Sequence, residues 1–367
     1  MPPRAVTAVQ NAAPPPKSLG DFFQQRENNF NLIRLVASLL VIYGHSYAVV
    51  KMGGADLFTR LIGWGFSGGL AVDMFFVISG FLVTASALKG DWRFYVASRV
   101  LRIYPGLLLC VTLTVFVLGP LLTIAPEYWK SPQIWRYWIH NGAAFTTEYF
   151  LPGVFADHRD KALNGVLWSV IIEVRLYVLV LILYFLGVLQ RRTLFNVLVV
   201  SALTIGYLAP SFIPLHPGST DMHVASLFLL GMFCWINREA MVLNEFILLG
   251  LLALAAVTLQ TDKFVVAYSL LVPYAVFMIA FAPGFGWFRR LGDYSYGVYL
   301  YGWPVQQCVL LLDPNMQAWK NALYSCVIAV VLGAISWHCF ERPILSLKKR
   351  LPWMPRKLVP STAMLIR

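Results

Sequence analysis

Ten apolar segments, most of them near the length that crosses a lipid bilayer, recur along the chain. A spanning helix needs roughly 20 predominantly apolar residues. The segments lie at residues 32–50, 66–88, 99–124, 165–189, 193–209, 223–236, 243–260, 264–281, 294–312 and 322–340. Hydrophobic residues form 59% of the 367 residues and charged residues only 13%, which excludes an ordinary soluble domain of this length. The sequence therefore predicts an all-α polytopic membrane protein, a bundle of about ten transmembrane helices.

The distribution of lysine and arginine predicts the orientation of the bundle, because cytoplasmic loops hold excess positive charge. With an even number of spans and an internal N-terminus, the cytoplasmic segments hold the larger set: Lys89, Arg93, Arg99, Arg102, Arg191, Arg192, Arg238, Arg289, Arg290, Arg342, Lys348, Lys349 and Arg350. The opposite loops hold the smaller set: Lys51, Arg60, Lys130, Arg136, Arg159, Lys161, Lys263 and Lys320. We therefore expect both termini in the cytoplasm.

The net charge of +12 is then a signal of topology and of contact with anionic lipid. Nucleic-acid binding is not expected, because the basic residues border helices and form no single patch. The five cysteines fall within predicted spans without metal-type or disulfide-type spacing, so we expect packing roles for them and no metal site.

The sequence divides into a bundle and two tails. Residues 1–27 are rich in proline and alanine and have no continuous apolar core, so we expect a flexible cytoplasmic tail and no secretory signal. Residues 28–345 form the transmembrane bundle, and residues 346–367 form a basic cytoplasmic tail. The longest loop, at about residues 125–164, lies on the outer face and is too long to be only a connector. Its aromatic residues either stack on sugar rings or rest at the membrane interface.

Arg34 and His45 interrupt the first apolar segment. Their separation of eleven residues is about three helical turns, so both side chains leave the same face of one helix. Ionisable side chains are costly in a membrane helix and usually line a substrate path or a reaction centre. The alternative is that Arg34 extends to the interface and His45 pairs with a neighbouring helix.

Two carboxylates are expected at a depth similar to that of His45. Counting about 1.5 Å per residue from the predicted helix ends places Asp73 of the second helix, and Glu173 of the fourth, near the level of the imidazole. The same count places Arg34, Arg99 and Arg102 near the cytoplasmic end.

Cations at the cytoplasmic end and titratable groups deeper in the membrane suit a long substrate with an anionic head on the inside and a reactive end in the bundle. An acyl-coenzyme A has this shape. Arg99 and Arg102, at i and i+3, share a helical face and could bind its phosphates, or they could serve as cytoplasmic anchors.

Transfer of an acyl group to a hydroxyl needs a base for the hydroxyl proton and donors for the developing oxyanion. His45 is the best candidate base, since its ordinary pKa of about 6.5 lies nearest to working pH. Either Asp73 or Glu173 is expected to orient it. Ser79 is a weaker candidate, as a nucleophile, because no base is assigned to it. A Ser-Gly pair in a membrane helix usually serves close packing. Direct transfer is the leading mechanism, and an acyl-histidine intermediate on His45 is the alternative.

Five motifs in order carry a resemblance to a known family. They are Arg34 with His45, Val72-Asp73-Met74-Phe75-Phe76-Val77-Ile78-Ser79-Gly80-Phe81-Leu82, Arg99-Val100-Leu101-Arg102-Ile103-Tyr104-Pro105, Leu167-Trp168-Ser169 with Glu173 and Tyr177, and Ser295-Tyr296-Gly297-Val298-Tyr299-Leu300 with the late Glu341-Arg342-Pro343. In this order and over about residues 28–343, the chain resembles the membrane-bound acyltransferase-3 family.

The resemblance implies an O-acyltransferase of the bacterial inner membrane. Such an enzyme takes an acyl group, most often acetyl, from cytoplasmic acyl-coenzyme A and delivers it to a hydroxyl of a cell-envelope glycan or lipid-linked sugar. By position, His45 carries the family's essential histidine and Arg34, Arg99 and Arg102 its essential arginines. The lipid bilayer and the acceptor are the implied partners, with a homo-oligomer or partners from envelope biosynthesis also open.

The sequence departs from the family pattern at two places. Gly302 stands where members often have a histidine before Trp303-Pro304, and the frequent Glu-Glu-Gln of the fourth helix is Glu173-Val174-Arg175. Arg175 is the visible candidate cation for a succinyl group, so acetyl and succinyl both remain open. No fused hydrolase-like domain is expected after Pro343, so the chain either completes the transfer alone or passes the acyl group to a partner.

Two other classes of protein fit part of the pattern. A transporter or flippase of a lipid-linked or acylated sugar would also place charged residues in spans, but it leaves the Arg-x-x-Arg segment unexplained. A purely structural scaffold would have no reason to keep Arg34, His45, Asp73 and Glu173 in apolar helices.

Overall fold

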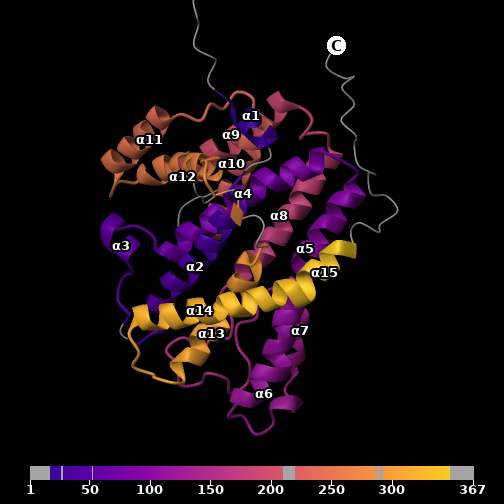
Figure 1. The fold of residues 1–367 in the computed structure, drawn as a ribbon, viewed down its shortest axis with the longest axis vertical. Coiled ribbons are helices and arrows are strands. Elements are labelled where there is room, and N and C mark those ends of the chain that lie inside the picture. Colours follow the sequence, from indigo (N-terminus) through magenta and orange to yellow (C-terminus); the bar gives the residue numbers. More distant parts are fainter. Residues whose placement is uncertain are drawn as a thin grey trace, which may run out of the picture.

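The protein is built from helices, as the computed structural model shows (Figure 1). The structure describes residues 17–25, 28–51, 53–209, 220–285, 287–288 and 292–347, and no strand occurs among them. Each of the ten predicted segments coincides with a helix. These helices are α2 (Phe30–Val49), α4 (Ser67–Leu88), α5 (Trp92–Leu113), α8 (Leu167–Phe185), α9 (Arg192–Leu208), α10 (Thr220–Ile236), α11 (Glu245–Thr258), α12 (Phe264–Ala280), α13 (Ser295–Leu310) and α14 (Ala318–Ser336).

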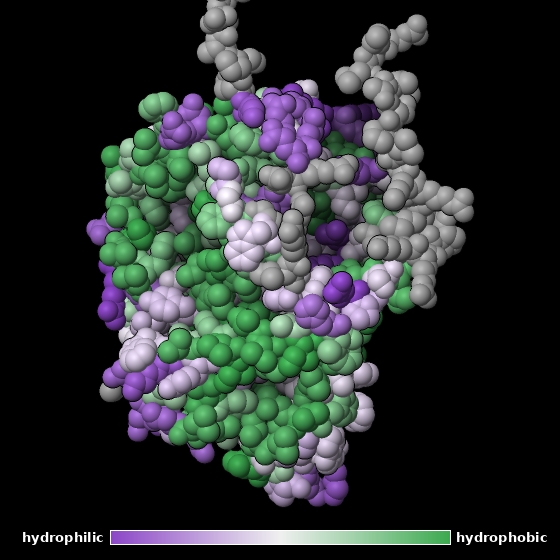
Figure 2. All heavy atoms as spheres, in the orientation of Figure 1, coloured by the Kyte–Doolittle hydropathy of each residue, from purple (hydrophilic) through white to green (hydrophobic). Residues whose placement is uncertain are grey.

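Two of these helices continue beyond a π-helical turn. Helix α5 runs on through η1 (Thr114–Leu118) into α6 (Gly119–Leu122), and α14 runs on through η4 (Trp337–Glu341) into α15 (Arg342–Leu347). In the described part of the chain, five helical stretches are long and apolar enough to cross a membrane: Phe30–Val49, Ser67–Leu88, Trp92–Leu122, Leu167–Phe185 and Ala318–Leu347. Figure 2 shows apolar side chains over a broad part of the surface, as expected for a chain that contacts lipid. The count of about ten spans and the cytoplasmic position of both termini stay predictions.

Helix α4 lies at the centre of the bundle, in contact with α2, α8, α10 and α12. Its closest neighbour is α10, because each helix places a glycine against the backbone of the other. A Cβ atom built on Gly80 would lie 2.0 Å from the carbonyl oxygen of Phe228, and one on Gly231 would lie 2.2 Å from that of Val77. Small residues allow membrane helices to approach in this way, so Gly80 of the Ser79-Gly80 pair does serve close packing.

A buried polar network fixes α2 against α13 and α14 beside His45. The Gln306 amide donates to the carbonyl oxygen of Ile42 at 2.7 Å and to Ser46 Oγ at 2.7 Å. The Asn321 amide donates to the carbonyl oxygen of Gln306 at 3.1 Å, and Ser46 Oγ donates to Asn321 Oδ1 at 3.0 Å. Buried polar groups that satisfy one another define a single arrangement of the helices that carry them. The height and rotation of α2 are thereby set.

The predicted outer loop contains ordered helices of its own. They are the 3-10 turn η2 (Tyr128–Lys130) and α7 (Pro132–Gly142). A separate short helix, α3 (Leu57–Ile62), lies in the connection between α2 and α4. Glu148, which follows α7, binds back to that helix. Its Oε1 accepts from Arg136 Nε at 2.7 Å and lies 2.9 Å from His140 Nδ1.

The segment predicted as an N-terminal tail includes a short helix, α1 (Leu19–Gln24). The Leu19 amide donates to the carbonyl oxygen of Met241, and the Leu19 side chain is fully buried. The remainder of residues 1–27, apart from 17, 18 and 25, lies outside the described residues. So do Arg289, Arg290 and residues 348–367 with their basic cluster.

Candidate functional site

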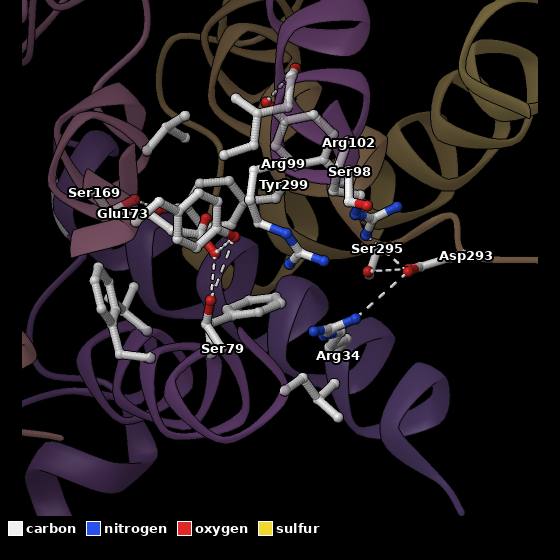
Figure 3. A pocket seen from close by; sticks show the side chains of 18 of the residues that line it. Arg34, Ser79, Ser98, Arg99, Arg102, Ser169, Glu173, Asp293, Ser295 and Tyr299 are labelled. Carbon is white, nitrogen blue, oxygen red and sulfur yellow. Dashed lines mark hydrogen bonds and ion pairs between the residues drawn. The ribbon is translucent and has the colours of Figure 1, made fainter. Parts of the chain in front are cut away.

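Three helices and one loop bring charged side chains to a single cavity, which we call the arginine pocket. Its volume is about 320 Å³. Arg34 comes from α2, Arg99 and Arg102 from α5, and Glu173 from α8, while Asp293 precedes α13 (Figure 3). The structure thus places four of the six predicted site residues in one pocket, including the three arginines that were expected to gather.

Asp293 holds two of these arginines. Its Oδ2 lies 2.7 Å from Arg102 Nη2 and 3.6 Å from Arg34 Nη1, and its Oδ1 accepts from Ser295 Oγ at 2.6 Å. Burial raises the pKa of the Asp293 carboxyl, but Arg102, Arg34 and the Ser295 hydrogen bonds together lower it by more, so the net pKa lies below the usual 3.8. Asp293 could not be identified from the sequence, because a loop carboxylate becomes significant only when the fold brings two arginines to it.

We expect Asp293→Asn to lower the stability of the fold by about 1–3 kcal/mol at neutral pH, because two guanidinium groups lose their carboxylate. Since the folded pKa is lowered, ionised Asp293 stabilises the fold above about pH 4, and this contribution disappears as the pH falls through the lowered pKa. Melting temperatures in detergent at about pH 6 and about pH 3 measure this, with the exposed Asp262→Asn as control. A difference from wild type that is equal at both pH values would contradict the ionic role of Asp293.

Arg99 differs from the other two arginines because it has no carboxylate partner. It makes no ion pair within the described residues, and its Nε is buried without a hydrogen-bond partner. Its guanidinium carbon lies 5.5 Å from the centre of the Tyr177 ring. In Figure 3 the guanidinium group points into the space between the Glu173 side and the Asp293 side of the pocket. The Arg99 side chain is half-buried and its buried Nε has no partner, which is costly unless a ligand supplies an acceptor, so Arg99 is the candidate anion-binding group of this pocket.

Glu173 faces Ser79 and Tyr177 instead of His45. Its Oε1 accepts from Ser79 Oγ at 2.7 Å and from Tyr177 OH at 2.5 Å. The expectation that Glu173 orients His45 is therefore wrong in this arrangement. The rotation of α8 directs the carboxylate toward Ser79 of α4.

His45 and Asp73 lie in a second cavity, which we call the histidine pocket. Its volume is about 500 Å³. Its lining is mostly aromatic and polar and consists of His45, Phe58, Trp64, Gly65, Phe66, Gly69, Leu70, Val72, Asp73, Tyr149, Trp168, Thr220, Asp221, His223, Val224 and Tyr299. The His45 ring packs at 5.3 Å from the centre of the Phe66 ring and at 4.8 Å from that of Trp303.

The His45 imidazole makes no hydrogen bond within the part of the chain that the structure describes. Asp73 instead accepts from Tyr268 OH at 2.6 Å and lies 3.1 Å from His223 Nε2. The expectation that Asp73 orients His45 is therefore also wrong. His45 is held by its aromatic neighbours, which leaves its nitrogens available to a ligand in the pocket.

His223 is a functional candidate that the sequence analysis missed. It stands at the start of the sixth apolar segment, where the sequence offers no motif, and only the fold places it beside Asp73. Its Nδ1 is buried without a partner. The acid–histidine pair that the sequence predicted thus exists in the histidine pocket, but its histidine is His223.

The two departures from the family pattern lie outside both pockets. Arg175 is exposed, and its Nη2 donates to the carbonyl oxygen of Phe145 at 3.2 Å. Gly302 faces α2, since a Cβ atom there would lie 2.7 Å from Ile42 Cγ1. Neither position adds a charged group to the arginine pocket or to the histidine pocket.

Comparison with known proteins agrees with the order of the motifs. A family described as acyltransferase domain matches residues 27–340. An O-acetyl transferase of Shigella phage Sf6 is 29% identical over 336 residues, which cover 88% of this chain and 97% of that protein. Nodulation protein 10 of Rhizobium leguminosarum bv. viciae is 27% identical over 88% of this chain and 95% of its own length. No solved structure was found to match. The chain belongs to the acyltransferase-3 family and is an acyltransferase.

Proposed function

We propose that this protein is an integral-membrane O-acyltransferase that moves an acyl group, most simply acetyl, from cytoplasmic acyl-coenzyme A to a hydroxyl of a cell-envelope or exported glycan. The observation that carries the proposal is the pairing of two pockets, one lined by three arginines and the other by His45, that share the side chains of Val72 and Tyr299. The name of the phage relative, an O-acetyl transferase, supports transfer of acetyl to oxygen.

The arginine pocket is the proposed donor site. Phosphate groups bind guanidinium groups through charge-assisted hydrogen bonds, and Arg99 has such donors to offer. The cluster from Arg34, Arg99 and Arg102 lies at the end of α2 and α5 that the charge distribution assigns to the cytoplasm. An acyl-coenzyme A bound there by its phosphates would direct its uncharged thioester toward Val72 and Tyr299.

The histidine pocket is the proposed acceptor site. There His45 removes the proton of the acceptor hydroxyl, and the hydroxyl oxygen forms a bond with the thioester carbonyl carbon. The carbon–sulfur bond then breaks, and the coenzyme A sulfur leaves as a thiol with the proton from the imidazolium. Direct transfer of this kind needs a single histidine with free nitrogens, which matches the surroundings of His45.

The lining of the histidine pocket favours an uncharged sugar. It includes the carboxylates of Asp73 and Asp221, and no lysine or arginine occurs among its described lining residues. Aromatic rings such as Trp64 and Trp168 offer apolar faces to a sugar ring, and the carboxylates accept hydrogen bonds from its hydroxyl groups. A phosphorylated or carboxylated sugar would meet like charges here.

The direct test uses membranes from a bacterium that expresses this protein. It measures transfer of label from radiolabelled acetyl-coenzyme A into glycans. We expect label in a glycan fraction, removed by mild alkali as an ester, and absent from membranes without the chain. Failure to label any glycan fraction with either acetyl- or succinyl-coenzyme A would refute the proposed reaction.

Arg175→Ala is expected to leave the rate of acetyl transfer within about twofold of wild type, because the exposed guanidinium donates to a loop carbonyl oxygen and lines neither pocket. The same variant should not alter the ratio of succinyl to acetyl transfer. A loss of succinyl transfer alone would show that Arg175 reaches the acyl group after all.

A further inference from the structure

The arginine pocket and the histidine pocket meet at one place in the fold. Of all their described lining residues, only Val72 of α4 and Tyr299 of α13 belong to both. Along α4, the residues before Val72 line the histidine pocket and those after it line the arginine pocket, on the face of the helix that carries Val72. Phe75, Phe76 and Ser79, at i+3, i+4 and i+7, line the arginine pocket, whereas Phe66 and Gly69 on the other side line the histidine pocket.

Both side chains at this boundary are held in place. Val72 is 5% exposed and Tyr299 is 7% exposed. The Tyr299 hydroxyl lies 2.5 Å from Ser169 Oγ and donates to the carbonyl oxygen of Val166 at 3.2 Å. The Tyr299 and Phe75 rings pack in a T-shaped arrangement, with 5.6 Å between the ring centres. Valine is stiff because its branched Cβ restricts χ1. The boundary is therefore apolar and rigid.

We propose that Val72 and Tyr299 select the acyl group by its size. This inference rests on the proposed function, in which the phosphates bind the arginines while the thioester must reach a hydroxyl beside His45. The acyl chain extends beyond the thioester sulfur, so it enters the space between Val72 and Tyr299 before the carbonyl carbon can meet the acceptor.

The chemistry of this boundary fits a short, uncharged acyl group. Val72, Phe75 and the ring of Tyr299 offer no charge to a carboxylate-bearing acyl group such as succinyl. In a rigid apolar pocket, each additional methylene changes the relative rate by about 10-fold or more. Acetyl is thus the expected group, and longer acyl chains are rejected by contact with these two side chains.

The test compares butyryl-coenzyme A with acetyl-coenzyme A as donors. We expect Val72→Ala to raise the ratio of butyryl to acetyl transfer by about 10-fold, because it removes two methyl groups from the boundary. Val72→Ile adds a methylene and should lower the ratio of propionyl to acetyl transfer. The matched control is Val83→Ala, which makes the same substitution in the same helix at a buried position that lines neither pocket.

The outcomes separate this inference from the function on which it rests. Unchanged donor ratios in both Val72 variants, with glycan acylation that still depends on His45, would overturn size selection and leave the acyltransferase reaction in place. Absence of transfer by the wild-type chain with all three donors would instead overturn the proposed reaction itself. If Val72→Ala does not yield folded protein, Val72→Ile provides the opposite shift, and an unchanged ratio in that variant alone counts against the inference.

Discussion

Replacement of His45 by alanine is expected to lower the rate constant of acetyl transfer by about 10²- to 10⁴-fold, the usual contribution of a general base. The reason is that, among the described lining residues of the histidine pocket, His45 is the histidine that leaves both ring nitrogens without a hydrogen bond. His223 lines the same pocket, but its Nε2 is engaged by Asp73. Transfer of label from acetyl-coenzyme A to glycan, measured at saturating donor, provides the rate.

The control for this prediction is His140→Ala. His140 lies on α7, interacts with Glu148 and lines neither pocket, so its loss should leave transfer close to the wild-type rate. Equal effects of the two substitutions would indicate a general loss of folded enzyme. Transfer at the wild-type rate by His45→Ala would show that another group accepts the hydroxyl proton, with His223 the next candidate.

Replacement of Arg99 by alanine is expected to raise KM for acetyl-coenzyme A by about 10- to 100-fold, the value of a charge-assisted hydrogen bond of about 1.5–3 kcal/mol. The rate constant at saturating donor should change by less than about threefold, because Arg99 binds the donor equally in the ground state and in the transition state. Arg99→Lys should recover only part of the affinity, since an ammonium group cannot form the paired hydrogen bonds of a guanidinium. Initial rates over a range of donor concentrations measure both parameters.

Arg93→Ala serves as the matched control on the same helix. Arg93 is exposed, packs over Trp92 and does not line the arginine pocket. A similar rise in KM in both variants would mean that general positive charge at the membrane surface, and not the pocket, attracts the donor. An unchanged KM in Arg99→Ala would remove the anion-binding role from this residue.

The helices of this fold could be predicted because their apolar segments are long and are separated by polar connections. All ten segments coincide with helices, and the gathering of Arg34, Arg99 and Arg102 followed from counting residues from the predicted helix ends. Height along a helix is encoded locally, because each residue adds a fixed rise. Rotation about the helix axis is not encoded locally, because it depends on packing against several neighbours.

Rotation explains the parts of the site that the sequence did not predict. The carboxylates of Asp73 and Glu173 are present in the expected helices, but each faces partners on other helices and neither reaches His45. Tyr268 and Asp293 come from segments nearly 200 residues from their partners, so no spacing rule connects them. The ordered helix α7 was hidden because its many aromatic residues suit both an interface loop and a short helix.

The most direct measurement is calorimetric titration of acetyl-coenzyme A into purified His45→Ala and Arg99→Ala in detergent, alongside their transfer rates. If the donor binds in the arginine pocket and reacts in the histidine pocket, His45→Ala binds the donor with the wild-type Kd but does not transfer acetyl. Arg99→Ala then shows the reverse, a Kd weakened about 10- to 100-fold with transfer retained at saturating donor. Loss of donor binding in His45→Ala, or wild-type binding in Arg99→Ala, would contradict this division between the two pockets.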